Sequence, residues 1–300
     1  MISMQLQAVL IILIIALGPL FITVYGVVFY KKRLQSKRRN PINNNLLRSP
    51  GESLRHRIED VNLDISTYLS LVTILPLMLY ALYISFSSLK NLSLFANVFY
   101  FVISLFSIVF IIYKLIKLVT IKAKLSLGYD AELAVGQELN SMMRDGYWVF
   151  HDVPAENYNI DHVLVGVAGV FAIETKGRSK LKQKDGKADH RVIYDGYKLD
   201  FPGWSETKPL DQASRQAKSL QTWLSSAVGE DVQVKPVLVL PGWFIERSSG
   251  AGMIVLNGKN PNSVLGRVYG NPLDDKLIKR IAHQLDQRCR TVKTQALQST

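Results

Sequence analysis

Three ionisable side chains near the middle of the chain have the types and spacing needed to hydrolyse a phosphate ester. Asp161 lies in one apolar segment rich in β-branched residues, and Glu174 and Lys176 lie in the next. A glycine-bounded turn separates the two segments, which predicts a β-hairpin. Because side chains alternate along a strand, Phe171 and Ile173 should face the core while Glu174 and Lys176 share the other face. Asp161 on the neighbouring strand can then approach Glu174.

Two carboxylates at the edge of an apolar sheet repel each other and are costly to desolvate. A divalent cation between them removes this repulsion, and Mg²⁺ (or Mn²⁺) favours oxygen ligands completed by water. We therefore expect Asp161, Glu174 and the backbone carbonyl of Thr175 to be the metal ligands. The metal would polarise a phosphate and activate a water, and Lys176 would orient that water or stabilise the transition-state charge.

Several of these residues also have ordinary structural interpretations. Glu174 and Lys176 taken alone could be an exposed ion pair on a strand, which contributes little to stability. His162 is expected to be a structural residue beside the site rather than a ligand, and His151 a strand-end residue.

The motifs around these residues resemble those of a known family. Asp followed by Glu-x-Lys across a hairpin is the signature of the PD-(D/E)xK nuclease superfamily. The surrounding sequence motifs resemble those of its NERD (nuclease-related domain) family. Four elements occur in the family's order. The chain departs from the pattern at two positions: Ala131 replaces a glycine in the first element, and Lys208 stands before the last element, where the family commonly has an asparagine. The four elements are Gly128–Glu132, Ile160–Val163, Gly169–Lys176 and Pro209–Ala213.

The resemblance implies a fold, further site residues and an activity. The fold would be a restriction-endonuclease-like core, an α/β domain with a mixed central sheet flanked by helices. Glu132 would assist the metal site from the first helix and Gln212 from the second, with Gln216, one turn later, as a competitor for that role. The implied activity is metal-dependent hydrolysis of nucleic-acid phosphodiester bonds, with DNA as the expected substrate.

A row of cations follows the Glu-x-Lys element. Arg178, Lys180, Lys182 and Lys184 alternate with other residues, so an extended chain would present them on the face of Glu174. Such a row can contact a phosphate backbone independently of sequence. A solvated loop is an equally good interpretation.

The elements that must position these residues can be read from periodicity and turn signals. Helical spacing of apolar residues predicts three helices, and short apolar runs bounded by turn residues predict the strands. Asp195-Gly196 is a strong hairpin signal between two of those runs. The predicted helices are 125–144, 209–225 and 274–288, and the predicted strands are 148–153, 159–165, 169–176, 191–194, 197–200, 232–240 and 253–256.

The N-terminal part of the chain predicts a membrane anchor. No charged residue occurs in residues 1–30, 66–89 or 91–113, and about 20 uncharged, mostly apolar residues suffice for a helix to cross a bilayer. We expect transmembrane helices at 6–30, 68–89 and 94–113. A signal peptide is disfavoured for the first, because its apolar run is long and it lacks a basic start and a cleavage site. No ionisable residue lies within these spans, which argues against a transporter.

Basic residues set the expected orientation. Residues 1–120 contain 12 Lys and Arg against 4 Asp and Glu, and residues 121–300 contain 24 against 20, so most of the net charge of +12 belongs to the membrane part. The basic segments follow the first and third spans, which predicts an N-terminus outside and a cytoplasmic nuclease domain at the inner membrane. The cluster at 31–39 could also bind anionic lipids or nucleic acid.

The sequence therefore predicts two parts: a membrane anchor, 1–120, with a basic cytoplasmic loop at 31–65, and a NERD-like nuclease domain, 121–300. Residues 40–50 are expected to be a flexible connector, followed by a short amphipathic helix.

The single cysteine, Cys289, excludes an intramolecular disulfide and a cysteine-based metal site. The expected partners are nucleic acid and the lipid bilayer, and no organic cofactor is expected. The sequence does not determine the oligomeric state. The alternative function is a catalytically silent nucleic-acid-binding or signalling module.

Overall fold

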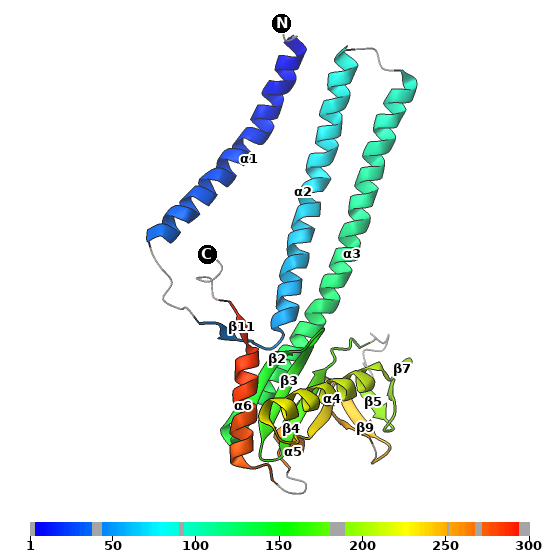
Figure 1. Cartoon of the computed structure of the whole chain (residues 1–300). Coiled ribbons are helices and arrows are strands. Elements are labelled where there is room, and N and C mark those ends of the chain that lie inside the picture. The colour runs from blue at the N-terminus through cyan, green and yellow to red at the C-terminus, as the bar shows by residue number, and fades with distance from the viewer. Residues whose placement is uncertain are drawn as a thin grey trace. The chain divides into compact units, whose positions relative to one another are not determined.

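The structure is a computed structural model that describes residues 4–37, 44–89, 93–180, 190–250, 252–267 and 272–293 (Figure 1). The chain divides into two compact units. One contains the described residues of 1–44 and 60–121, and the other contains residues 45–59 and 122–293.

The first unit is helical. Helix α1 spans Met4–Lys37, and most of α2 (Glu52–Leu89) and the first half of α3 (Leu94–Ser141) complete the unit. Among the described residues, α2 and α3 are the two helices that are long and apolar enough to cross a membrane. The predicted spans at 68–89 and 94–113 lie within these two helices, and the span predicted at 6–30 lies within α1.

Helix α3 differs from the prediction in its length. The sequence suggested a span ending near 113 and a separate helix starting at 125, but both belong to one helix of 48 residues. The intervening residues contain no glycine or proline, so nothing interrupts the backbone hydrogen bonds. The helix passes into a 3₁₀ turn, Met142–Asp145, and ends at Gly146, whose φ of 82° is left-handed.

The second unit is built on a mixed five-stranded sheet with the order β10-β8-β4-β3-β2. Strands β2, β3 and β4 form an antiparallel meander, whereas β8 pairs in parallel with both β4 and β10. The bounds are Trp148–Pro154 for β2, Asn159–Gly166 for β3, Gly169–Thr175 for β4, Val234–Val239 for β8 and Ile254–Leu256 for β10. A mixed sheet with helices was expected and is observed.

Helices cover both faces of this sheet (Figure 1). Helices α4 (Lys208–Val228) and α6 (Asp275–Cys289) pack apolar side chains against one face. The second half of α3 and the short helix α5 (Asn262–Leu265) pack against the other. Phe171 and Ile173 are buried in the α3 layer, as strand alternation predicted.

A second sheet packs beside the N-terminal end of α4. Its order is β7-β6-β5-β9, with β5 at Arg191–Tyr194, β6 at Leu199–Phe201, β7 at Trp204–Glu206 and β9 at Phe244–Arg247. The hairpin predicted at Asp195-Gly196 joins β5 to β6. Strands β7 and β9 were not predicted, because each is short and pairs only in tertiary context.

The segment preceding α2 is part of the second unit, which corrects two expectations. Residues 40–50 were expected to be a flexible connector. Residues 40–43 lie outside the described residues, but Leu46–Leu47 forms strand β1 and pairs with β11 (Arg290–Val292). The loop expected over 31–65 is helical up to Lys37, in α1, and again from Glu52, where the short helix expected after residue 50 is the start of the much longer α2. Strand β1 was not predicted because its partner lies more than 240 residues away in the sequence and leaves no local signal.

Two glycines of α3 make different contacts, and the difference is testable. A Cβ added at Gly136 would lie 2.6 Å from Cγ of Pro50, whereas one at Gly128 would lie 3.3 Å from Cδ1 of Leu54, the end of a flexible side chain. Alanine normally stabilises a helix by roughly 0.5–1 kcal/mol relative to glycine. We expect Gly128→Ala to be neutral or stabilising and Gly136→Ala to destabilise by about 1–3 kcal/mol. Thermal unfolding of the full chain in detergent measures both, and a Gly136→Ala variant as stable as Gly128→Ala would contradict the packing.

Candidate active site

The structure brings Asp161 and Glu174 together across the β3–β4 pair. His162 is the partner of Ile173 in this antiparallel register, so Asp161, one residue earlier, lies beside Glu174, one residue later. The carboxylate Oδ2 of Asp161 accepts the backbone N–H of Thr175 at 2.6 Å. Glu132 reaches the same region from α3, close enough for its charge to act on both carboxylates.

These three carboxylates are largely withdrawn from water. Glu174 is 1% exposed and Glu132 is 9% exposed, while Asp161 is half-buried. Burial first, then the charges of Asp152 and Glu174, raise the pKa of Glu132 to about 8. Burial and the charges of Glu174 and Glu132 likewise hold the pKa of Asp161 well above its ordinary range. The charge of Glu174 therefore makes ionisation of both Glu132 and Asp161 harder.

Lys176 is the cation that faces this group. Its Nζ forms an ion pair with Oε1 of Glu174, and its charge lowers the pKa of both Glu132 and Asp161. The ion pair expected for Glu174 and Lys176 alone is therefore present, but Glu174 is buried rather than exposed. The backbone N–H of Lys176 donates to the carbonyl of Val239 at 2.9 Å, which continues the β4–β8 ladder to the site.

Two buried oxygen atoms at the site are available to bind a cation. Oε2 of Glu174 and Oγ1 of Thr175 are both buried without a hydrogen-bond partner, and unsatisfied buried polar atoms are rare in folded proteins. Among the described residues, no group of three or more His, Cys, Asp or Glu side chains is arranged so that it could hold a metal ion. Mg²⁺ does not require such a set, because it retains several waters and binds through one or two carboxylates. The residues present fit that mode of binding.

Two glutamines of α4 compete for the supporting position. Gln212 is half-buried in the first turns of the helix. Gln216 is 3% exposed; its Nε2 donates to the carbonyl of Asn159 at 3.5 Å, and its Oε1 has no partner. Since β3 begins at Asn159, the structure connects Gln216 to the strand of Asp161.

The two histidines form a buried pair on the α3 side of the sheet. Nδ1 of His151 lies 2.9 Å from Nδ1 of His162, and Nε2 of His151 lies 3.0 Å from Oδ1 of Asn140. Burial lowers the pKa of His151 to about 4 and holds that of His162 well below its ordinary value, so both rings are neutral at pH 7. Because Oδ1 of Asn140 can only accept a hydrogen bond, the proton of the neutral His151 ring is on Nε2. Nδ1 of His162 then donates to Nδ1 of His151. This arrangement agrees with a structural role.

The basic row beyond the site is only partly described. Arg178 forms a bidentate ion pair with Glu206 of β7 at 2.8 and 2.9 Å, and Nζ of Lys180 lies 5.6 Å from the ring centroid of Trp243. Both cations therefore have partners within the second unit. Lys182 and Lys184 lie outside the described residues, and phosphate contact by this row remains a prediction.

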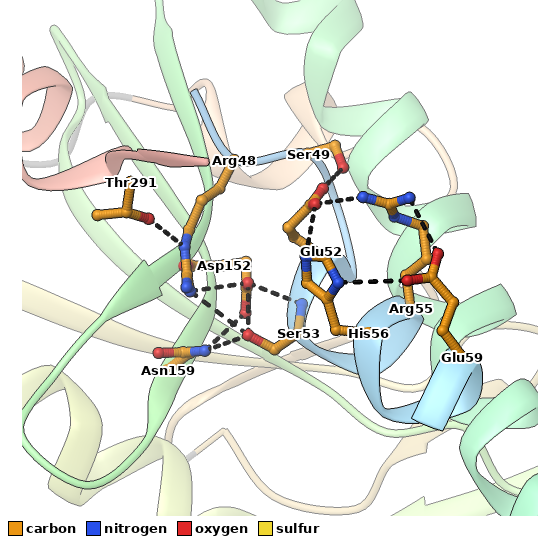
Figure 2. Close-up of polar contacts among 10 residues, drawn as sticks. All are labelled: Arg48, Ser49, Glu52, Ser53, Arg55, His56, Glu59, Asp152, Asn159 and Thr291. Carbon is orange, nitrogen blue, oxygen red and sulfur yellow. Dashed lines mark hydrogen bonds and ion pairs between the residues drawn. The ribbon is translucent and has the colours of Figure 1, made fainter. Parts of the chain in front are cut away.

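Sequence reasoning missed a fourth carboxylate, Asp152. It follows His151, the partner of His162 in the β2–β3 register, and therefore lies on the strand beside Asp161. Its backbone has a φ of +48°, and its buried side chain accepts hydrogen bonds from Arg48, Ser53 and Asn159 (Figure 2). Only the Ser49-x-x-Glu52 pattern, typical of a helix start, could have indicated that a folded segment supplies these partners.

The raised pKa of Glu132 predicts a pH-dependent stability in the absence of metal. The folded state binds more protons than the unfolded state between the ordinary pKa of 4.5 and about 8, so the free energy of unfolding falls as the pH rises through this range. Glu132→Gln removes this loss. In EDTA, we expect the variant to be more stable than the wild type at pH 9 by on the order of 1 kcal/mol or more, with a smaller difference at pH 5. Glu138→Gln, exposed on the same helix, is the control, and a pH-independent difference for Glu132→Gln would contradict the assignment.

Comparison with known proteins agrees with the motifs. No curated protein and no solved structure matches the chain. Residues 127–241 match the family model of the nuclease-related domain, NERD. This range contains Glu132, Asp161, Glu174, Lys176 and Gln212, and the match confirms the resemblance of this part of the chain to the NERD family.

Proposed function

We propose that this chain is a membrane-anchored, metal-dependent nuclease that hydrolyses phosphodiester bonds of DNA. The observation that carries the proposal is the convergence of three carboxylates, Glu132, Asp161 and Glu174, on one lysine, with a buried Glu174 oxygen that has no partner. Perturbed pKa values combined with a specific charge partner are typical of functional sites. The NERD match supports a nuclease-related function.

The chain's own residues would have distinct roles in this reaction. Asp161 and Glu174, with the carbonyl of Thr175, would hold Mg²⁺ or Mn²⁺, which supplies Lewis-acid polarisation of the phosphate and a more acidic bound water. The Thr175 amide fixes the orientation of Asp161. Lys176 would donate from Nζ to a non-bridging phosphate oxygen and stabilise the charge that develops there. Glu132 and Gln212 or Gln216 would support the ligands from the two helices.

The anchor is part of the proposal. Helices α2 and α3 have the length and apolarity to cross a bilayer, and the exposed apolar side chains along them, such as Phe95 at 81% and Phe106 at 68%, require an apolar environment. With α1 as a third span, the positive-inside rule places the N-terminus outside and the nuclease-related domain at the cytoplasmic face of the inner membrane. The substrate would then be nucleic acid near the membrane.

The first prediction from this proposal concerns cleavage. The full chain in detergent should nick DNA with Mg²⁺, and Glu174→Gln, which removes a charged ligand but keeps the side chain's shape, should reduce the rate at least about 100-fold. Glu246→Gln, exposed on β9, should cleave at the wild-type rate. Defined single- and double-stranded DNA and RNA substrates, with and without EDTA, make the measurement.

If wild type and Glu174→Gln were equally inactive on every substrate, catalysis would be excluded. Salt-sensitive binding without cleavage would then favour the silent nucleic-acid-binding module.

The second prediction concerns metal binding and does not depend on activity. Saturating Mg²⁺ binds only the folded site, so it should raise the melting temperature of the wild type by on the order of 5 °C. In Glu174→Gln the same addition should give a much smaller shift, since one of two carboxylate ligands is lost. Equal shifts in both proteins would place the Mg²⁺ elsewhere.

A further inference from the structure

A segment far outside the NERD match is built into the domain that carries the site. Residues 45–59 belong to the same compact unit as residues 122–293, although the family match begins at 127. Strand β1 pairs with β11, and the backbone N–H of Arg48 donates to the carbonyl of Cys289 at 3.2 Å. The segment then turns and becomes the first two turns of α2.

Arg48 connects this segment to two strands (Figure 2). Its Nε donates to Oγ1 of Thr291 at 2.8 Å, and its Nη1 donates to Oδ2 and to the backbone carbonyl of Asp152 at 2.9 and 3.0 Å. The side chains of Arg48 and Asp152 are 20% and 5% exposed. Removing only one member of such a buried ion pair strongly destabilises the folded state, because the remaining charge stays buried without its partner.

Asp152 receives hydrogen bonds from both the segment and the site strands. Its Oδ2 accepts the backbone N–H of Ser53 at 3.0 Å and the Ser53 hydroxyl at 2.7 Å, which caps the first turn of α2. Its Oδ1 accepts from Nδ2 of Asn159 at 3.0 Å. Asn159 begins β3, two residues before Asp161, and its carbonyl accepts from Gln216 of α4.

The turn before α2 packs directly on the helix that carries Glu132. Gly51 is buried with a φ of +68°, and a Cβ there would lie 2.7 Å from the ring of Tyr129 and 3.6 Å from Oε2 of Glu132. The ring of Pro50 covers Gly136 one turn further along α3. Gly51 therefore lies beside the Glu132 carboxylate, and no larger residue than glycine fits at this position.

We propose that Asp152 is a positioning residue of the site, and that Arg48 and Ser53 hold it so that segment 45–59 fixes the Glu132 side of the site and the start of β3 together. The inference rests on the proposed nuclease function for its effect on turnover. It adds that the NERD match alone does not contain everything the site needs: residues 45–59, at the base of α2, complete it. The alternative is that this network only anchors the segment and leaves the carboxylates unaffected.

The test uses the full chain in detergent with Arg48→Met, Arg48→Lys and Asp152→Asn. Arg280→Met, which breaks an ion pair to the exposed Glu230, is the matched control. Arg48→Met should lower kcat on DNA by roughly 10- to 100-fold with little change in KM, because it misplaces ligands rather than removing substrate contacts. Arg48→Lys keeps a charge toward Asp152 and should recover part of kcat. Arg280→Met should match the wild type.

Amide hydrogen exchange provides a second readout that needs no activity. In Arg48→Met, exchange should rise at least about tenfold both at Ser53, whose N–H bonds Asp152, and at Thr175, whose N–H bonds Asp161. Faster exchange at Ser53 with wild-type exchange at Thr175 and wild-type kcat would overturn the proposal, since the network would then be an anchor only. A wild type without cleavage would overturn the nuclease function, but exchange at Thr175 would still decide the positioning role. If Asp152→Asn fails to fold, the two Arg48 variants carry the test.

Discussion

The mutual repulsion of Glu132, Asp161 and Glu174 is the interaction on which the rest of the structure depends. Three carboxylates lie within electrostatic reach of one another, two of them nearly inaccessible to water, and Lys176 is the cation that faces them. Such an arrangement opposes folding, and it persists only because the surrounding sheet and helices fix it. Burial that opposes stability in this way is typical of a functional site, and a divalent cation held by Asp161 and Glu174 would offset the repulsion.

The elements around the site are each needed to hold these charges in place. The β3–β4 register sets Asp161 beside Glu174, the parallel β8 strand buries Glu174, and α3 brings Glu132 to the same edge. Because α3 is one helix from Leu94 to Ser141, Glu132 and the apolar stretch proposed to cross the membrane belong to the same helix. The base of α2 contributes the other connection, through Arg48 and Asp152.

Sequence reasoning succeeded where local patterns determine structure. Strand alternation placed Phe171 and Ile173 in the core and opposed Glu174 to them, and helical periodicity with a proline near the start gave α4. It failed where contacts join distant residues. The pairing of β1 with β11, the left-handed φ of Asp152 and the ion pair of Arg178 with Glu206 depend on partners that no local motif indicates. The hairpin pattern correctly identified Asp161 and Glu174 as neighbours. The segment that encloses the site, in contrast, begins in residues that were expected to be a connector.

Mn²⁺ binding to the full chain, measured by electron paramagnetic resonance, tests whether the acidic group around Glu174 binds a divalent cation. We expect one Mn²⁺ per chain that Mg²⁺ displaces, and its loss in Glu174→Gln but not in Glu138→Gln. Mn²⁺ bound equally by wild type and Glu174→Gln, or not bound by either, would contradict this expectation.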